Sequence, residues 1–277
     1  ATWEVDMPFP APDRATYDSD PRIAAIQSRL DRTDSIIPNF KSMHRMGARL
    51  PQECVRITAG EFASMIFGTT YDVPSYSNWL LEEADLGPAY DYHRRFLQFL
   101  QWKCPAERWV LKSPAHLWSL EEMLAAYPDA RLIQTHRDPL KTTSSLASLI
   151  TTLRAMGSDH VDPVAIGKQW ARWNAAAVNA SARARQDGLI GSGRIIDVSF
   201  YEFMDAPLEQ VQRIYDFFEL ELSTSIRNRM QDYLNTHTAD QHGAHRYDFH
   251  DFGFDVAEER ERVRPYQEYF DVPAEIR

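Results

Sequence analysis

The chain has 277 residues, 44% of them hydrophobic, which is enough to bury one substantial core, so a single domain over residues 1–277 is expected. The formal net charge of −10 argues against broad binding to nucleic acid or to an anionic membrane, so any anionic ligand needs a local cationic cluster. Two cysteines define neither a disulfide framework nor a metal site, which fits a reducing compartment, and we expect a cytoplasmic protein.

The predicted elements begin with an irregular arm over residues 1–17, where closely spaced prolines interrupt any periodicity. A helix is expected from residue 20 to 34, because Asp-Pro is a favourable helix start and apolar residues then recur on one face. Another helix is expected over residues 52–67. Glu53 falls in its first turn, where a carboxylate can complement the helix dipole or act as a general base at the mouth of a site.

The next stretch has the pattern of a helical insertion with many aromatic residues. Pro74 and Pro88 each stand at an expected helix start, which predicts helices over residues 73–83 and 87–103. Most of the aromatic side chains are expected in the core. An insertion of this kind is also where an apolar pocket for an acceptor molecule can be built.

The segment from Arg108 to Thr152 organises the chain, because it has the pattern of a βαβα unit. Strands are predicted at residues 109–111 and 131–135, each followed by a helix. Parallel strands require such crossovers, and in open α/β sheets ligands bind beyond the carboxyl ends of the strands. The residues at these two ends are Lys112 with Ser113 and His136 with Arg137.

The helix after Asp138 gives the sharpest signal for an anion site. Asp138 is a good N-cap and Pro139 suits the first helical position, so Arg137 stands immediately before a helix N-terminus. Free N–H groups and the helix dipole favour an anion there, and arginine adds a bidentate partner for phosphate. Ser145 lies seven residues after Asp138, so it points in nearly the same direction from the helix axis, about 10 Å further along it. The alternative is that Arg137 is a surface arginine in a salt bridge and that the serine and threonine residues of the helix simply face solvent.

The remaining predicted elements are a helix over residues 163–186, a strand over 194–200 that ends at Tyr201, and helices over 208–218, 223–235 and 256–269. Residues 237–254 contain four histidines and one arginine without alternation, a pattern typical of a surface loop. The cysteines and histidines do not have the spacing of metal ligands, so no metal site is predicted. No apolar stretch approaches the length of a membrane span.

Four motifs stand out along the chain, W-V-L-K-S-P-A-H-L, Y-P-D-A-R-L-I-Q-T-H-R-D-P, V-S-F-Y-E-F-M-D-A-P and G-A-H-R-Y-D-F-H-D-F-G-F. Together they resemble the sulfotransferases that use 3′-phosphoadenosine 5′-phosphosulfate (PAPS), especially a bacterial branch. The resemblance extends along nearly all of the chain. It implies a helix-rich α/β fold, with a P-loop-type parallel sheet flanked by helices and a helical insertion.

The resemblance also implies roles for individual residues. Arg137 and Ser145, eight positions apart, would hold the 3′-phosphate of the cofactor, and Lys112 would lie near the transferred sulfuryl group. Tyr201 would pack on the adenine. The loop expected to close over the nucleotide contributes His245, Arg246 and Tyr247.

Two residues are candidates for the general base that a hydroxyl acceptor requires. His116 lies four residues after Lys112, near the start of the following helix, and the ordinary pKa of histidine suits a base near neutral pH. In the better-known branch of the family the catalytic histidine comes two residues after the lysine, where this chain has Pro114. Glu53 is the alternative base.

One motif of the family is expected to be lacking. A turn of the type P-x-S-G-T-T, which holds the 5′-phosphosulfate after the first strand, should precede the segment that opens this chain. The F-G-T-T at Phe67–Thr70 follows an apolar helical run and lacks the charged residue of such a turn. We therefore expect the first strand and the phosphosulfate loop to be missing, which would leave strand 109–111 on an exposed apolar edge.

Two classes of function follow from these observations. The first is an enzyme that needs no metal and moves a sulfuryl group from PAPS to a hydroxyl of a small or lipid-like acceptor, by positioning and electrostatic stabilisation. The second is an inactive nucleotide-binding or interaction module that keeps only the 3′-phosphate half of the site. A kinase-like phosphoryl transferase is disfavoured, because no Walker-type lysine loop or magnesium-binding carboxylate follows a strand. The acceptor and the oligomeric state stay open.

Overall fold

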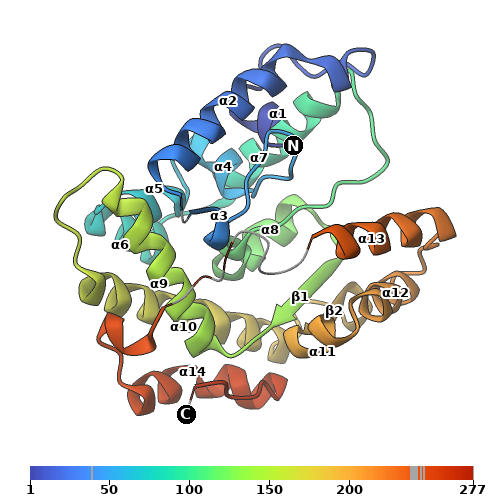
Figure 1. Ribbon diagram of the computed structural model, residues 1–277. Coiled ribbons are helices and arrows are strands. Elements are labelled where there is room, and N and C mark those ends of the chain that lie inside the picture. Colours follow the sequence, from blue (N-terminus) through green and yellow to red (C-terminus); the bar gives the residue numbers. More distant parts are fainter. Residues whose placement is uncertain (39, 238–242, 244, 246, 277) are drawn as a thin grey trace. The chain divides into compact units, whose positions relative to one another are not determined.

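The computed structural model describes residues 1–38, 40–237, 243, 245 and 247–276, and it divides into two compact units (Figure 1). Unit 1 comprises Ala1–Ala126 and Thr152–Ser158. Unit 2 comprises Tyr127–Thr151 and Asp159–Arg277. The expectation that the whole chain forms one domain stays a prediction.

Unit 1 is built mainly from helices. Its α-helices are α1 (Thr2–Asp6), α2 (Pro21–Ile36), α3 (Phe40–Met43), α4 (Val55–Thr58), α5 (Ile66–Thr70), α6 (Pro74–Glu82), α7 (Gly87–Gln101) and α8 (Leu120–Ala126). Its 3₁₀ helices are η1 (Tyr17–Ser19), η2 (Ala59–Glu61) and η3 (Pro114–Trp118). Helices α2, α6 and α7 begin where the sequence predicts, because a proline lies in the first turn of each.

Unit 2 combines helices with two strands, β1 (Leu132–His136) and β2 (Ile195–Ser199). Its helices are α9 (Pro139–Ala155, of which residues 152–155 belong to unit 1), α10 (Pro163–Gln186), η4 (Ser192–Arg194), α11 (Phe200–Asp205), α12 (Pro207–Phe217), α13 (Thr224–Thr236), η5 (Phe249–Phe252) and α14 (Val256–Phe270). The predictions of β1, β2, α10, α12, α13 and α14 are confirmed to within a few residues.

The two strands run parallel and side by side (Figure 1), with His136 opposite Ser199 at their carboxyl ends. The chain between them passes through α9 and α10, which is the long crossover that a parallel pair requires. Arg137 and Tyr201 follow the two strands and therefore emerge at the same edge of the sheet. A small parallel sheet among many helices confirms the helix-rich α/β class.

His136 is buried in a polar network, although its place at a strand end indicated a ligand site. Its Nε2 lies 2.9 Å from Oδ1 of Asp197, and its Nδ1 lies 2.8 Å from the hydroxyl oxygen of Tyr266. Arg185 donates hydrogen bonds of 2.9 and 2.8 Å to the same aspartate. Burial would raise the pKa of Asp197, but the hydrogen bonds from His136 and Arg185 outweigh burial and hold that pKa well below its usual range. The network joins both strands to α10 and α14.

The core of unit 2 is centred on α10, which packs against α14 and η5. Trp170 and Trp173 point inward, as predicted, with their ring centres 5.1 Å apart and edge to face. Gly167 permits the close approach of η5, because a Cβ atom at this position would lie 2.6 Å from the carbonyl oxygen of Phe252. Any side chain at residue 167 would therefore displace η5.

The amino-terminal arm is helical at α1, so the prediction of an irregular segment is wrong for these residues. Trp3 is fully buried and packs with Ile26 and Ala48. The guanidinium of Arg22 lies 4.7 Å from the centre of the same indole ring. Burial of this large aromatic surface stabilises a short helix that the proline pattern does not reveal.

The helix predicted over residues 52–67 is interrupted, and α4, η2 and α5 replace it. Phe62 follows η2 with a left-handed backbone, at φ 55°. Ser64 stabilises the break, because its hydroxyl donates to the carbonyl of Val55 at 2.6 Å and its N–H donates to the hydroxyl of Tyr76 at 3.0 Å. These tertiary hydrogen bonds override the apolar periodicity that indicated one continuous helix.

The strand predicted at residues 109–111 does not form, so this prediction is wrong. The backbone there has no strand partner within the described ranges, and Val110 is 92% exposed. The segment is anchored instead where the N–H of Cys54 donates to the carbonyl of Lys112 at 3.0 Å. Apolar side chains alone cannot make a strand, since its backbone groups need a neighbour. The helix expected next is divided into η3 and α8.

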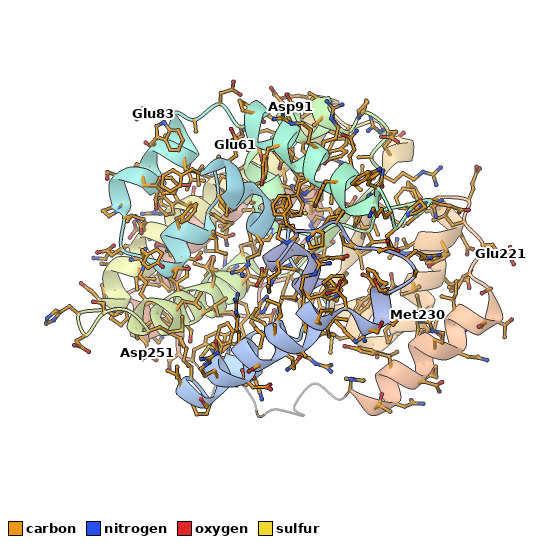
Figure 2. All side chains as sticks on the ribbon, turned by 90° about the horizontal axis from the view of Figure 1, so that it is seen from above. Glu61, Glu83, Asp91, Glu221, Met230 and Asp251 are labelled. Atoms are coloured by element: carbon orange, nitrogen blue, oxygen red, sulfur yellow. The ribbon has the colours of Figure 1, made fainter. Side chains whose placement is uncertain are left out.

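No described helix is both long and apolar enough to cross a membrane. Exposed acidic side chains such as Glu61, Glu83 and Asp91 project from the surface of unit 1 (Figure 2). The net negative charge therefore gives no general attraction for anions, and a site for an anion depends on particular cationic residues.

Candidate functional site

Arg137, directly after β1, is held in a bidentate ion pair. Its Nε and Nη2 donate to the carboxylate of Glu275 at 2.7 and 2.9 Å. Tyr201, at the start of α11, donates its hydroxyl hydrogen to the same carboxylate at 3.0 Å. The guanidinium carbon also lies 4.0 Å from the centre of the Phe200 ring. Two strand ends and the carboxyl-terminal segment thus meet around one anionic group.

The pKa of Arg137 is raised, chiefly by the hydrogen bond with Glu275 and against the effect of burial. The alternative interpretation from the sequence, a salt-bridged arginine, therefore describes the structure as it stands. The same geometry shows what the arginine can bind, because two parallel N–H groups match the oxygens of a carboxylate or a phosphate equally well.

Asp138 caps α9, as predicted, and holds the carboxyl-terminal segment. Its fully buried side chain accepts from the N–H of Leu140 at 3.0 Å and from Arg260 at 2.7 and 3.1 Å. The backbone N–H groups of Glu275 and Ile276 also donate to it, at 2.6 and 3.1 Å. Burial would raise the pKa of Asp138, but the hydrogen bonds, with that from Arg260 the largest, hold the pKa below its usual value. Residues 275–276 are therefore fixed beside Arg137 by a buried carboxylate.

Two residues of the predicted nucleotide loop lie along α9. The Nε2 of His245 is 2.9 Å from Oγ of Ser148, and the ammonium of Lys141 is 4.8 Å from the centre of the Tyr247 ring. Lys141 and Ser148 are seven residues apart and therefore share a face of the helix. Burial lowers the pKa of His245, which favours its neutral form. Tyr247 also makes a small electrostatic contribution to the raised pKa of Arg137, after those of Glu275 and burial.

The structure leaves two members of the predicted set without a defined contact. Ser145 is half-buried in α9 and makes no side-chain hydrogen bond to another residue that the structure describes. Arg246 lies outside the described residues. The pairing of Ser145 with Arg137 and the part played by Arg246 stay predictions.

Unit 1 contains the three predicted catalytic residues, and two of them are in direct contact. The ammonium of Lys112 donates to Oε1 of Glu53, and Nε2 of His44 lies 3.9 Å from the same oxygen. Burial would raise the pKa of Glu53, but the contacts with His44 and Lys112 hold it below its usual value. Glu53 is therefore an ionised, paired carboxylate with a low affinity for protons.

His116, in η3, is neutral at physiological pH. Burial lowers the pKa of its imidazole from 6.5 to about 4, Glu53 opposes this effect, and the positive charge of Lys112 adds to it. The hydroxyl oxygen of Tyr90 lies 2.7 Å from Nδ1 of His116. A neutral imidazole is the form that can accept a proton, so His116 meets the protonation requirement of a general base.

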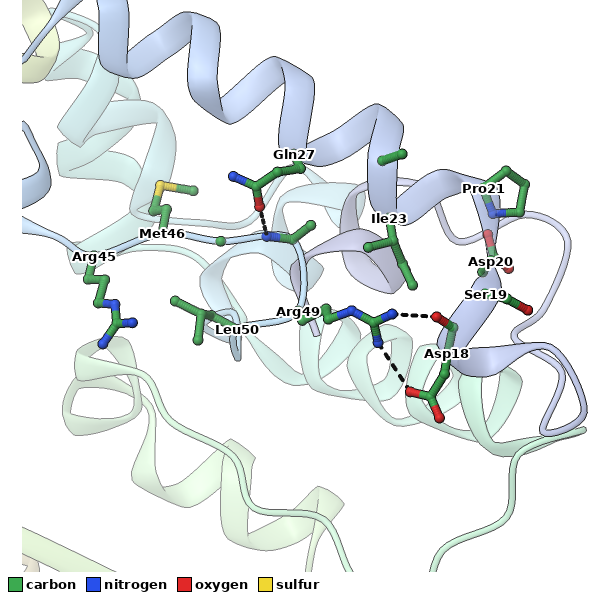
Figure 3. Close-up of a pocket in the computed structure, with 13 residues that line it drawn as sticks. Asp18, Ser19, Asp20, Pro21, Ile23, Gln27, Arg45, Met46, Arg49 and Leu50 are labelled. Carbon is green, nitrogen blue, oxygen red and sulfur yellow. Dashed lines mark hydrogen bonds and ion pairs between the residues drawn. The ribbon is translucent and has the colours of Figure 1, made fainter. Parts of the chain in front are cut away.

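A separate hollow of about 690 Å³ in unit 1 contains none of the predicted site residues (Figure 3). It lies between α2 and the loop of residues 45–50. Arg49 bonds there to Asp18, and the N–H of Ala48 donates to Gln27 at 3.1 Å.

The described residues contain no cluster that could bind a metal, and the Cys54 thiol is buried. No group of three or more histidine, cysteine, aspartate and glutamate residues among them could hold a metal ion. Burial, the largest effect, raises the pKa of the Cys54 thiol to about 11. That cysteine is therefore unreactive at neutral pH.

Several contact residues were missed by sequence reasoning. Lys141 lies one helical turn after Arg137, so its spacing was a usable signal. Glu275 and Tyr90 gave no signal, because their roles depend on contacts 138 and 26 residues away along the chain.

A model of the sulfotransferase family matches residues 5–224. The structure is similar to the crystal structure of sulfotransferase STF9 from Mycobacterium avium, with a TM-score of 0.84 and 29% identity, over 99% of this chain and 70% of that one. It is also similar to sulfotransferase STF1 from Mycobacterium tuberculosis, with a TM-score of 0.80 and 29% identity, over 95% of this chain and 68% of that one. No curated protein shows significant similarity.

Proposed function

Because this chain belongs to the sulfotransferase family, an enzyme family, we propose that it moves a sulfuryl group from PAPS to a hydroxyl of a small or lipid-like acceptor. Bound PAPS supplies the activated sulfuryl group. The chain must bind the nucleotide and take the proton from the acceptor. We assign nucleotide binding to residues of unit 2 and the proton transfer to residues of unit 1.

The observation that carries the proposal is the pairing of Arg137 with Glu275. Two guanidinium hydrogen bonds and the hydroxyl of Tyr201 already converge on one anionic group. Glu275 stands in for a phosphate, because both anions offer two oxygens to the arginine fork. These donors fit the 3′-phosphate of PAPS, which would bind Arg137 in place of the glutamate.

The rest of the nucleotide site is assigned to α9 and the loop beside it. Lys141 adds a second cation one turn from Arg137, and Ser145 is assigned to the same phosphate by resemblance to the family. The ring of Tyr201 is assigned to the adenine by the same resemblance, whereas its hydroxyl group is the donor beside Arg137. The loop residues that complete the assignment are His245, Arg246 and Tyr247.

His116 is the preferred general base. Its pKa of about 4, set mainly by burial, keeps the ring neutral at pH 7. Glu53 is the weaker candidate, because its carboxylate is already paired with the ammonium of Lys112 and lies 3.9 Å from Nε2 of His44. These contacts hold the pKa of Glu53 below its usual value against the effect of burial.

Lys112 is assigned to charge stabilisation near the sulfuryl group. Its side chain is 72% exposed and makes one contact with Glu53. A flexible, exposed ammonium can leave this partner for negative charge that develops during the reaction.

The expected lack of a phosphosulfate loop stays a prediction.

The test is the transfer of radiolabelled sulfate from PAPS to a panel of phenols, sterols and glycolipids. We expect Arg137→Ala to give less labelling than the wild-type chain at low PAPS concentration. Nucleotide binding without transfer to any acceptor would support the inactive-module alternative. Failure to bind PAPS at all would contradict the proposal.

The pH dependence of the same reaction tests the base. His116 must be unprotonated to act, and its pKa of about 4, lowered mainly by burial, keeps it so above pH 5. Activity should therefore stay nearly constant from about pH 8 to 5 and fall as the pH approaches 4. A fall centred near the ordinary histidine pKa would assign the titration to another group.

A further inference from the structure

His116 is connected to two other side chains of unit 1 by a series of short contacts. The hydroxyl oxygen of Tyr90 lies 2.7 Å from Nδ1 of His116 and 2.9 Å from Oγ of Ser119. Oγ of Ser119 in turn lies 3.3 Å from the carbonyl oxygen of Ala115. Tyr90 belongs to α7, whereas the other three residues belong to η3 or directly follow it.

The contact of 3.3 Å with the backbone carbonyl favours one direction for the whole series. A carbonyl oxygen can only accept, so Ser119 uses its single hydroxyl hydrogen on Ala115. Ser119 must then accept from Tyr90, whose single hydrogen is committed by this bond. Tyr90 in consequence accepts from His116, which requires a hydrogen on Nδ1. In a neutral ring this leaves the lone pair on Nε2.

Burial makes this direction costly to reverse. Tyr90 is 4% exposed and Ser119 is 3% exposed, so water has little access to either hydroxyl group. A buried polar group that loses its partner is destabilising. Turning one hydroxyl would break the bond at its other side, so the series reverses as a unit or stays as it is.

We propose that Tyr90 and Ser119 are positioning residues that hold His116 as the Nδ1–H tautomer, with Nε2 directed to the proton of the acceptor hydroxyl. The role of Nε2 rests on the proposed function, whereas the tautomer does not. In the proton transfer, the O–H bond of the acceptor breaks, an Nε2–H bond forms, and the electron pair stays on the acceptor oxygen. The imidazolium keeps its bond to Tyr90 and later releases the proton to water.

Two charged groups act on the charge of the ring. Glu53 favours the protonated form, and Lys112 disfavours it. These two groups affect whether the ring is protonated, whereas the bond to Tyr90 determines which nitrogen of the neutral ring carries the hydrogen. A further titratable group, His93, lies on α7 with Tyr90, and burial, with a smaller effect of His116, lowers its pKa to about 4, so it is neutral as well.

The direct test is ¹⁵N NMR of the histidine-labelled full chain at pH 7, with His116→Gln used to assign the signal. We expect a protonated Nδ1 and an unprotonated Nε2 in the wild type. Ser119→Ala frees the hydrogen of Tyr90 to turn towards Nδ1, so the Nε2–H tautomer should increase. Tyr90→Phe removes the acceptor, so both tautomers should be populated. Tyr92→Phe makes the same chemical change two residues along α7 and should leave the spectrum unchanged.

Kinetics provide the second readout. Tyr90→Phe and Ser119→Ala should each lower kcat by about three- to tenfold, the range expected for one neutral hydrogen bond. The KM for PAPS should stay within about twofold, because neither residue is assigned to the nucleotide. Ser119→Thr keeps the hydroxyl and should retain the wild-type tautomer and kcat.

A wild-type His116 with its hydrogen on Nε2 would overturn the proposal, as would an unchanged tautomer and kcat in both variants. If Tyr90→Phe fails to fold, the wild-type spectrum and Ser119→Ala still decide. Full activity of His116→Gln would remove His116 from the proposed mechanism while the NMR result on the tautomer stands, so the two failures are distinguishable.

Discussion

Lys112 in unit 1 and Arg137 in unit 2 are each paired with a carboxylate far away in sequence, yet the two pairs differ in kind. Lys112 makes one contact with Glu53, and its side chain is 72% exposed. Arg137 makes two hydrogen bonds with Glu275, is 30% exposed and lies over the ring of Phe200. An exposed ion pair contributes little stability and exchanges readily, whereas a stacked, bidentate arginine is pre-organised.

This difference separates two tasks. A pre-organised arginine selects an anion by shape, because its fork and the adjoining Tyr201 define where oxygens must lie. A mobile lysine can follow a charge that changes during a reaction. We therefore expect substitutions in unit 2 to change nucleotide affinity and substitutions in unit 1 to change turnover.

The largest expected effect lies in unit 1, at His116. His116→Gln should reduce sulfuryl transfer by about two to four orders of magnitude, because this is the usual contribution of a general base. The affinity for adenosine 3′,5′-bisphosphate should not change. Steady-state transfer assays and calorimetry measure the two quantities. Full activity in this variant together with a collapse in Glu53→Gln would move the role of base to the glutamate.

Arg137→Lys tests whether the fork matters as well as the charge. The substitution keeps one positive charge but loses the bidentate geometry, so binding of adenosine 3′,5′-bisphosphate should weaken by about tenfold or more. The exposed Arg229 provides the control, since Arg229→Lys should leave the affinity unchanged. Equal affinities of Arg137→Lys and the wild type would show that the arginine does not grip the phosphate.

Glu275→Gln should act in the opposite direction. Glutamine keeps oxygen and shape beside Arg137 and Tyr201 but removes the charge that competes with a phosphate. The bisphosphate should therefore bind about three- to tenfold more tightly, the value of about one hydrogen bond. Fluorescence titration at fixed ionic strength measures the change. Weaker binding would mean that Glu275 organises the site instead of competing for it.

The smallest effect is expected for the exposed pair in unit 1. Lys112→Met should change the free energy of unfolding by less than about 1 kcal/mol, since an exposed ion pair contributes little. Chemical denaturation measures this value, and Lys41→Met at the exposed pair with Asp34 is a matched control. A loss of several kcal/mol would show that the pair of Lys112 and Glu53 stabilises the fold and is not a weak, exchangeable ion pair.

Much of the fold could be predicted from local patterns. Helix α10 and its inward Trp170 and Trp173 follow from apolar spacing, and Asp138 with Pro139 marks the start of α9. Predictions from local sequence patterns failed where contacts between residues distant in sequence determine the backbone structure. The break at Ser64 depends on Tyr76, and the apolar run at residues 109–111 finds no strand partner among the described residues.

The candidate site shows the same division. Arg137 could be recognised because an arginine before a capped helix has a local signature. Glu275, which occupies its guanidinium, lies near the other end of the chain and has no local signature. Tyr90 was likewise invisible as a partner of His116, since a tyrosine on an amphipathic helix is ordinarily a core residue.

Calorimetric titration of the wild-type chain with adenosine 3′,5′-bisphosphate and with adenosine 5′-monophosphate tests whether Arg137 holds the 3′-phosphate. The two ligands differ only in the 3′-phosphate that Arg137 is proposed to hold. We expect the bisphosphate to bind about ten- to a hundredfold more tightly, because a hydrogen bond to a charged group contributes about 1.5 to 3 kcal/mol. Equal affinities for the two nucleotides would contradict this role of Arg137.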